Sequence, residues 1–205
     1  MDSAPTILSI NPGQPEEALI KRAARILCDG GLVAFPTETV YGLAADATNP
    51  QAIERLNQVK GRPPDKPYSI HLRDAGQIRE FVSEVSPLAQ RLIEQFWPGP
   101  LTIVMPAKAG SPVGFRVPDH PVAQAFLRQC QRSVVAPSAN RSGFPPPTDG
   151  KEVVRALDGQ CDCLLDAGPT PLGRESTVVS VVGNRLEILR EGAIAAAALQ
   201  AAGHR

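Results

Sequence analysis

Helical and strand-like segments alternate irregularly along this chain, and this alternation limits its possible folds more than any other feature. Residues 15–31, PEEALIKRAARILCDGG, place apolar side chains at helical spacing, with acidic residues in the first turn and glycines at the end. Residues 32–36 and 133–137 are short apolar runs that end in proline, which is typical of buried strands. Because these segments do not follow one another as regular β-α-β units, we predict an α+β fold, a mixed β-sheet with helices packed on it.

The same patterns place the other elements. Helices are predicted at residues 15–31, 49–60, 74–82, 86–97, 120–130 and 151–157, with a short alanine-rich helix near residue 200. Strands are predicted at residues 32–36, 68–72, 101–106, 133–137, 161–166, 176–182 and 185–190. The last two strands flank Gly183-Asn184, which is a hairpin signal, although a weaker one than Asn-Gly. No repeat or linker divides the chain, so we expect one domain over residues 1–205.

Composition narrows the functional class. Lys+Arg and Asp+Glu number 21 each, and the resulting net charge of zero argues against a generally basic nucleic-acid binder, although not against a local basic cleft. The N-terminal residues do not form a signal-peptide pattern, and no apolar run reaches transmembrane length. The four cysteines include no C-x-x-C pair. We therefore expect a reduced, cytoplasmic protein without a membrane association.

A basic, proline-rich stretch follows the second predicted helix. Residues 59–72, VKGRPPDKPYSIHL, hold Lys60, Arg62 and Lys66 close together among three prolines. Cations at a helix C-terminus suit the helix dipole, and that explanation covers Lys60 well. It covers Arg62 less well, because Gly61 has already ended the helix and the next two prolines stiffen the loop. A guanidinium on a preset loop also suits phosphate, so both interpretations stay open.

Other polar residues stand at strand ends or inside apolar segments. Ser138 and Asn140 follow a predicted strand and could donate to an oxyanion, although both are also ordinary turn residues. Arg116 lies in an apolar segment and needs either an acidic partner or an anionic ligand. Arg190 could simply pair with its neighbour Glu191, and His71 alternates with apolar residues as a half-buried histidine would.

Common catalytic motifs are absent from the sequence. It contains no G-x-x-x-x-G-K-[ST] loop, no G-x-G-x-x-G turn and no H-E-x-x-H pair, and its three histidines are scattered. We predict no protein-held metal site.

Seven short motifs, taken in order, resemble one family. FPTETVYGL, KGRP, FWPGPLT, FRVPDHP, APSAN, ESTVV and LREG occur with the order and spacing of the YrdC-like threonylcarbamoyl-AMP synthases, over about residues 15–194. Each motif alone is a weak signal, and seven in order are specific. The resemblance implies a twisted mixed β-sheet with helices packed on it and a concave, positively charged cleft. Because the chain ends soon after LREG, it resembles the short, single-domain form of the family.

The resemblance also implies a reaction. L-threonine, bicarbonate or CO2, and ATP would form threonylcarbamoyl-adenylate and pyrophosphate. A tRNA-modifying transfer complex would then carry the threonylcarbamoyl group to adenosine 37 of tRNA. Direct contact with RNA or tRNA is a further expectation, as is Mg2+ bound with ATP rather than in a dedicated protein cage. Glu38 and Asp166 are weak candidates to assist that ion.

The resemblance also implies the site residues, most of which lie in the seven motifs. As catalytic groups on the nucleotide phosphates the resemblance implies Lys60 and Arg62. The ATP site would also include Ser138, Asn140, Thr148 and Arg190. The threonine site would include Thr37, His71, Arg116 and Ser176, with Arg116 on the carboxylate.

Two other functions compete with this hypothesis. One is a related carbamoyl-transfer protein of the same superfamily, although those domains sit in longer chains with zinc-finger-like cysteines. The other is an RNA- or tRNA-binding module without synthase activity, which would bind RNA with a steep dependence on salt.

Overall fold

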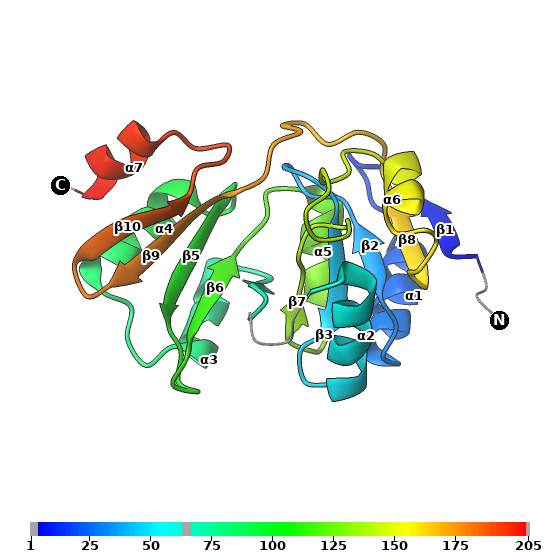
Figure 1. The fold of residues 1–205 in the computed structure, drawn as a ribbon, viewed down its shortest axis with the longest axis horizontal. Coiled ribbons are helices and arrows are strands. Elements are labelled where there is room, and N and C mark those ends of the chain that lie inside the picture. The colour runs from blue at the N-terminus through cyan, green and yellow to red at the C-terminus, as the bar shows by residue number, and fades with distance from the viewer. Residues whose placement is uncertain (1–3, 63–66, 204–205) are drawn as a thin grey trace.

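The fold is built on one mixed β-sheet (Figure 1). The computed structural model describes residues 4–62 and 67–203. The strands in these parts of the chain are β1 (Thr6–Ser9), β2 (Val33–Phe35), β3 (Gly42–Asp46), β4 (Ile70–His71), β5 (Leu101–Pro106), β6 (Pro112–Arg116), β7 (Val134–Val135), β8 (Cys163–Asp166), β9 (Thr177–Val182) and β10 (Arg185–Arg190). They lie side by side in the order β1-β8-β2-β3-β7-β4-β6-β5-β9-β10. Parallel and antiparallel pairs both occur, which confirms the predicted mixed sheet.

Helices cover this sheet. They are α1 (Glu17–Cys28), α2 (Pro50–Lys60), α3 (Ile78–Phe81), α4 (Pro87–Phe96), α5 (Pro121–Gln129), α6 (Gly150–Ala156) and α7 (Ala196–Gly203), with a 3-10 turn, η1 (Ala75–Gln77), before α3. None of the helices in the described parts of the chain has the length and apolar character that crossing a membrane requires.

Most predicted elements are present with small shifts at their ends. The long helices are confirmed, and Asn49 caps α2 by accepting hydrogen bonds from the backbone N–H groups of Gln51 and Ala52. The predicted helix at residues 74–82 is divided into η1 and α3. The predicted strand at residues 68–72 is reduced to the two residues of β4. Strands β1, β3 and β6 were not among the predicted elements.

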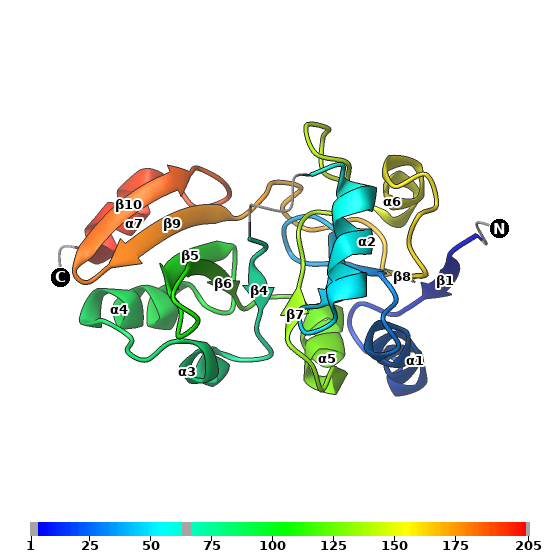
Figure 2. The same cartoon turned by 60° about the horizontal axis from the view of Figure 1, so that its bottom comes forward.

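The two halves of the sheet differ in how they are covered (Figures 1 and 2). In the half made by β1, β8, β2 and β3, α1 and α5 pack on one face and α2 and α6 on the other, and a separate apolar cluster lies on each side. In the half made by β6, β5 and β9, α3, α4 and α7 pack on one face around a third cluster. The opposite face of that second half carries the cleft described below.

The alternation of side chains along each strand explains why the face opposite the third cluster can form the cleft. In β5, Leu101 and Ile103 point into the third cluster, whereas Thr102 and Val104 line the cleft. In β6, Phe115 is buried in the cluster and its neighbour Arg116 lines the cleft. The apolar half of each strand therefore builds the core, and the alternate residues form the floor of the cleft.

Candidate active site

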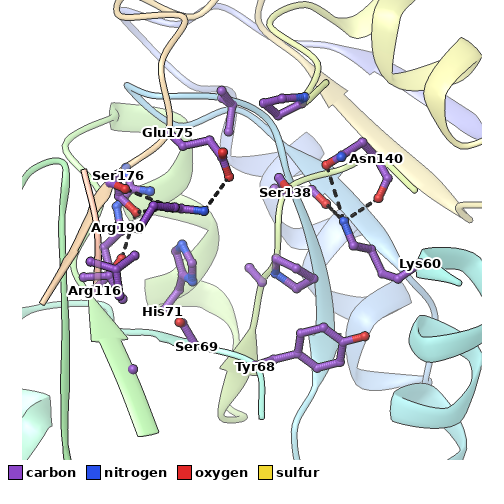
Figure 3. A pocket seen from close by; sticks show the side chains of 18 of the residues that line it. Lys60, Tyr68, Ser69, His71, Arg116, Ser138, Asn140, Glu175, Ser176 and Arg190 are labelled. Atoms are coloured by element: carbon purple, nitrogen blue, oxygen red, sulfur yellow. Dashed lines mark hydrogen bonds and ion pairs between the residues drawn. The ribbon is translucent and has the colours of Figure 1, made fainter. Parts of the chain in front are cut away.

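A cleft of about 850 Å³ lies where the open face of β5, β6 and β9 meets the ends of β4 and β7. The residues that sequence reasoning selected and that line this cleft are Thr37, Lys60, Arg62, His71, Arg116, Ser138, Asn140, Ser176 and Arg190. They come from segments far apart in the chain, and the fold brings them together. Figure 3 labels all of them except Thr37 and Arg62.

Thr148 is the selected residue that does not line this cleft. Its side chain belongs to a neighbouring cavity of about 650 Å³, and its hydroxyl donates to Glu152 Oε2 at 2.9 Å. Glu152 lies in α6, so the contact holds the segment just before that helix. The predicted place of Thr148 in the nucleotide site is therefore not supported by the position of its side chain.

Lys60 ends α2 and is almost fully buried, with 4% of its surface exposed. Its ammonium group donates to the carbonyl oxygen of Ser138 at 2.5 Å and to the carbonyl oxygen of Asn140, and it lies 3.4 Å from Asn140 Oδ1. Burial, with a smaller contribution from the charge of Arg62, lowers the pKa of Lys60 to about 8, and Glu175 opposes the shift. Lys60 thus carries its charge to the cleft while holding the loop after β7.

The same loop uses the amide of Asn140 internally. Asn140 Nδ2 donates to the carbonyl oxygens of Arg141 at 3.0 Å and Phe144 at 2.6 Å, and the N–H of Ser142 donates to the carbonyl of Lys60 at 2.8 Å. These contacts are turn chemistry, one of the two alternatives that the sequence left open for Asn140. The Asn140 amide shapes the loop, and residues of this loop line the cleft.

Arg62 follows the α2 cap formed by Gly61, which adopts a left-handed conformation with φ of 57°. Its guanidinium lies over the ring of Tyr68, 4.8 Å from the ring centre, and Nη2 reaches the carbonyl of Pro67 at 3.4 Å. Tyr68 is fixed in turn by its hydroxyl, which donates to Asn57 Oδ1 at 2.8 Å. An aromatic platform therefore orients Arg62. Pro63, Pro64 and Lys66, which sequence reasoning also singled out, lie outside the described residues.

Arg116 has the acidic partner that its apolar surroundings require. Its Nη2 lies 2.7 Å from Glu38 Oε1, with side-chain exposures of 6% and 8%, although that oxygen is not aligned for a hydrogen bond. Nη2 also donates to Thr39 Oγ1 at 2.8 Å, and Nε to the carbonyl of Gly99 at 3.3 Å. Glu38 is held from its other oxygen, which accepts from the N–H of Asp119 at 3.1 Å. The sequence left open whether Arg116 has an acidic partner or an anionic ligand. In the structure it forms a buried ion pair with Glu38, and its guanidinium also faces the cleft.

Thr37 begins the turn that carries this pair. Its hydroxyl donates to the carbonyl of Val40 at 2.7 Å and lies 2.8 Å from Thr39 Oγ1. It also accepts from the N–H groups of Thr39 and Val40. The hydroxyl is thus engaged in the turn at the edge of the cleft.

His71 pairs in register with Arg116 on β6 and with Val134 on β7. It is 7% exposed, and its Nδ1 is buried without a hydrogen-bond partner in the described residues. Burial, with a smaller contribution from the nearby Arg116, lowers the pKa of His71 to about 3, and a contact with the Ser69 backbone opposes the shift. The imidazole is therefore neutral at physiological pH.

Ser176 and Arg190 meet where β9 begins and β10 ends. Arg190 Nη2 donates to the carbonyl of Ser176 at 2.9 Å, and the Ser176 hydroxyl lies 2.9 Å from Thr102 Oγ1. Arg190 Nη1 forms an ion pair with Glu175 at 2.8 Å. The partner of Arg190 is thus Glu175 rather than the adjacent Glu191 that the sequence suggested.

The positive charge of the cleft is smaller than the number of its basic side chains indicates. Four of the described lining residues are basic, Lys60, Arg62, Arg116 and Arg190, and one, Glu175, is acidic. Arg116 and Arg190 each have a carboxylate partner. No group of three or more metal-binding side chains occurs among residues 4–62 and 67–203. The positive character of the cleft stays a prediction that rests mainly on Lys60 and Arg62.

Several lining residues were missed by sequence reasoning. Glu175 stood inside the ESTVV motif, and Tyr68 and Ser69 stood in the predicted strand before His71, but none was singled out. Thr102 carried a usable signal, because it is the polar residue in an apolar strand. Ser142 and Phe144 lie in the loop after β7, and their placement depends on the Lys60 and Asn140 contacts.

Comparison with known proteins places the chain among related sequences. The family model Sua5_yciO_yrdC, described as telomere recombination, matches residues 25–192. A threonylcarbamoyl-AMP synthase of Bacillus subtilis is 42% identical over 185 residues, which cover 85% of this chain and 54% of that protein. A threonylcarbamoyl-AMP synthase of Nitrosococcus oceani is 33% identical over 168 residues, which cover 75% of this chain and 91% of that protein.

Solved structures show the same relationship. The crystal structure of Sua5 from P. abyssi complexed with L-threonine superposes with a TM-score of 0.90 at 36% sequence identity. The match covers 96% of this chain and 60% of that one. The chain therefore spans little more than half the length of the B. subtilis relative and of the P. abyssi structure.

Proposed function

The chain belongs to the Sua5/YciO/YrdC family, and from this premise we propose that it is an L-threonylcarbamoyladenylate synthase. Its substrates would be L-threonine, bicarbonate or CO2, and ATP, and its products threonylcarbamoyl-AMP and pyrophosphate. The observation that carries the proposal is the gathering on one cleft of nine residues that the family resemblance implies, eight of them within the seven motifs. Because the chain spans about half the length of its B. subtilis relative, the activity has to be tested on this chain itself.

The proposed reaction requires the protein to align the substrates and to place positive charge near the leaving pyrophosphate. It does not require a nucleophilic side chain. The threonine amine attacks CO2, a C–N bond forms, and the amine loses a proton. A carbamate oxygen then attacks the α-phosphorus of ATP, the bond to the β-phosphate oxygen breaks, and pyrophosphate leaves. Fixed cations near the leaving group would stabilise the charge that develops there. Arg62, oriented on Tyr68, is the group best placed to do this.

Lys60 would support the same step in two ways. Its positive charge faces the cleft, and its hydrogen bonds hold the Ser138 and Asn140 carbonyls in place. We assign it to the nucleotide side together with Ser138, Asn140 and Arg190. Thr148 is left out of this group, because its hydroxyl is engaged with Glu152 outside the cleft.

The threonine side would lie around β4 and β6. Arg116, already oriented by Glu38 and Thr39, would receive the threonine carboxylate. The neutral imidazole of His71 would offer a hydrogen bond without repelling the amine. Ser176 and the turn formed by Thr37 would complete the boundary.

Mg2+ would enter with ATP as part of the substrate. An ion of this kind keeps several waters and is bound mainly by the phosphates. The product would pass, in the cytoplasm, to a complex that transfers the threonylcarbamoyl group to tRNA. Contact of this chain with RNA would be independent of the synthase activity, and an RNA-binding assay would measure it.

Threonine-dependent pyrophosphate release from ATP with bicarbonate tests the proposal. We expect release that requires all three substrates and that falls when threonine is omitted. The competing RNA-module function would instead give no threonine-dependent release, together with RNA binding that weakens steeply as salt rises.

A further inference from the structure

Glu175 has an unusual position for a carboxylate in a cleft that would bind anions. It is the one acidic side chain among the described residues that line the cleft. Its Oε1 pairs with Arg190 at 2.8 Å, and its carboxylate points into the space between Arg190 and Lys60 (Figure 3). Its negative charge reaches Lys60, because it raises the pKa of that ammonium against the effect of burial. A phosphate that approaches these cations therefore also meets a negative charge.

The backbone fixes Glu175 without help from its side chain. The N–H of Ala193 donates to the Glu175 carbonyl at 2.9 Å. Gly192 packs directly beneath, and a Cβ at this glycine would come 2.3 Å from the same carbonyl oxygen, so only glycine allows the approach. The carboxylate is thus placed at the cleft by the junction of β9 with the segment after β10.

Pairing with Arg190 does not by itself account for this carboxylate. The two side chains are 45% and 37% exposed, and ion pairs this accessible to water contribute little to stability. Arg190 also donates to the Ser176 carbonyl at 2.9 Å. Glu175 Oε2 has no hydrogen-bond partner in the described parts of the chain. Glu175 therefore lines the cleft with one carboxylate oxygen that no described residue engages.

Other carboxylates near the site are committed elsewhere. Glu38 is buried against Arg116 and accepts from the Asp119 N–H, so it is unsuited to assist a metal ion. Asp166 does not line the cleft, and its Oδ1 accepts from the N–H of Gly168 at 3.0 Å. Both were weak candidates for an Mg2+ contact from the sequence, and the structure turns both away from that role.

We propose that Glu175, through the carboxylate oxygen that Arg190 does not engage, is a protein ligand for the divalent cation that enters with the nucleotide. The inference rests on the proposed function, because it requires ATP in this cleft. Mg2+ in nucleotide sites is commonly held by one or two carboxylates plus phosphate oxygens and water, so a single glutamate suffices. Glu175 then has two opposite effects: it repels free ATP, and it attracts Mg-ATP.

This arrangement predicts a coupling between metal and nucleotide that depends on one side chain. Mg2+ should tighten ATP binding to the unmodified protein by roughly tenfold or more, since it converts a repulsion between charges a few ångströms apart into an attraction. In Glu175→Gln the repulsion and the metal contact are both lost. Free ATP should then bind a few-fold more tightly, and added Mg2+ should change the affinity by only about twofold.

Isothermal titration of ATP, without threonine or bicarbonate, tests this with and without MgCl2. The variants are Glu175→Gln, Glu175→Asp, which keeps the charge on a shorter side chain, and Glu191→Gln as a matched control outside the cleft. Glu175→Asp should keep part of the coupling, and Glu191→Gln all of it. Binding of Mn2+ in the presence of ATP, followed by electron paramagnetic resonance, gives a second readout and should weaken in Glu175→Gln.

The possible outcomes distinguish the metal role of Glu175 from the proposed synthase activity. An equal Mg2+ effect in Glu175→Gln and in the unmodified protein overturns the metal role and leaves the synthase proposal intact. Equal tightening of ATP and Mg-ATP in the variant also overturns it, since Glu175 would then be only a counter-ion for Arg190. A protein that binds no ATP under either condition overturns both.

Discussion

The ammonium of Lys60 lies 2.5 Å from the carbonyl oxygen of Ser138, so a cation expected on phosphate is part of the hydrogen bonding of the protein itself. The same group donates to the Asn140 carbonyl, and the Lys60 carbonyl accepts from the Ser142 N–H. The end of α2 and the loop after β7 are therefore joined from both directions. Changes at Lys60 should affect the loop as well as the charge of the cleft.

Lys60→Met should lower both stability and activity. Two backbone carbonyls lose a buried charged donor, which should cost about 1–3 kcal/mol in the free energy of unfolding. Displacement of the loop should lower kcat/KM for pyrophosphate release by roughly a hundredfold. Urea unfolding and a pyrophosphate assay measure the two effects, with the exposed Lys151→Met in α6 as control. Unchanged stability with a raised KM for ATP would show that Lys60 contacts phosphate without positioning the loop.

Arg62→Ala should separate substrate binding from folding. The guanidinium is half-exposed and stacks on Tyr68, so its removal should cost less than about 1 kcal/mol of stability. The KM for ATP should rise by at least about tenfold, because a phosphate loses a charged donor. Arg79→Ala, which changes an exposed arginine outside the cleft, should leave both quantities unchanged. A large fall in melting temperature with normal kinetics would make Arg62 a structural residue.

Local patterns were enough to predict most of the fold. Amphipathic periodicity and caps located the long helices, and apolar runs located β2, β5 and β9. Strand β3, with the sequence GLAAD, gave no such signal, because glycine and alanine have weak strand preference. It becomes a strand through its pairing with β2 on one side and β7 on the other. Tertiary contacts of this kind leave little trace in a single sequence.

Candidate site residues were predictable as a group, but their contacts were not. The family resemblance selected nine residues that share one cleft, and all of them except His71 lie in the seven motifs. Sequence reasoning allowed either a ligand or an ion pair for Arg116, and its partner Glu38 lies far away in the chain. Likewise, the sequence left open whether Ser138 and Asn140 donate to a ligand or shape a turn, and it did not indicate that their carbonyls accept from Lys60. The partner of each polar side chain depends on distances between segments remote in the sequence, and only the fold determines these distances.

Arg116→Ala should reduce stability as well as threonine binding. Removing the guanidinium leaves the buried Glu38 carboxylate without its cation, which typically costs about 3–5 kcal/mol. The double variant Glu38→Gln with Arg116→Gln removes both charges and should recover much of that loss. The KM for threonine should stay raised in both, as measured by pyrophosphate release. Recovery of the KM together with stability would exclude Arg116 from the threonine site.

His71 should give the protein a steeper loss of stability in acid. The folded pKa of about 3 is below the ordinary value near 6.5, so between these values the unfolded chain binds a proton that the folded protein does not. The contribution of His71 is therefore full above pH 6.5 and is lost as the pH falls toward 3, by on the order of 1 kcal/mol per pH unit at most.

His71→Gln, a neutral replacement, tests this through urea unfolding at several pH values between 7.5 and 4.5. The surroundings of the side chain are Arg116 on β6 and the ring of Phe35 on β2, 6.1 Å away and nearly perpendicular. Whatever the variant costs at pH 7.5, its stability should fall less steeply below pH 6.5 than that of the unmodified protein. A residual slope is expected from His120, whose pKa burial also lowers. Parallel profiles over the whole range would mean that His71 gains its proton in the folded protein as readily as in the unfolded chain.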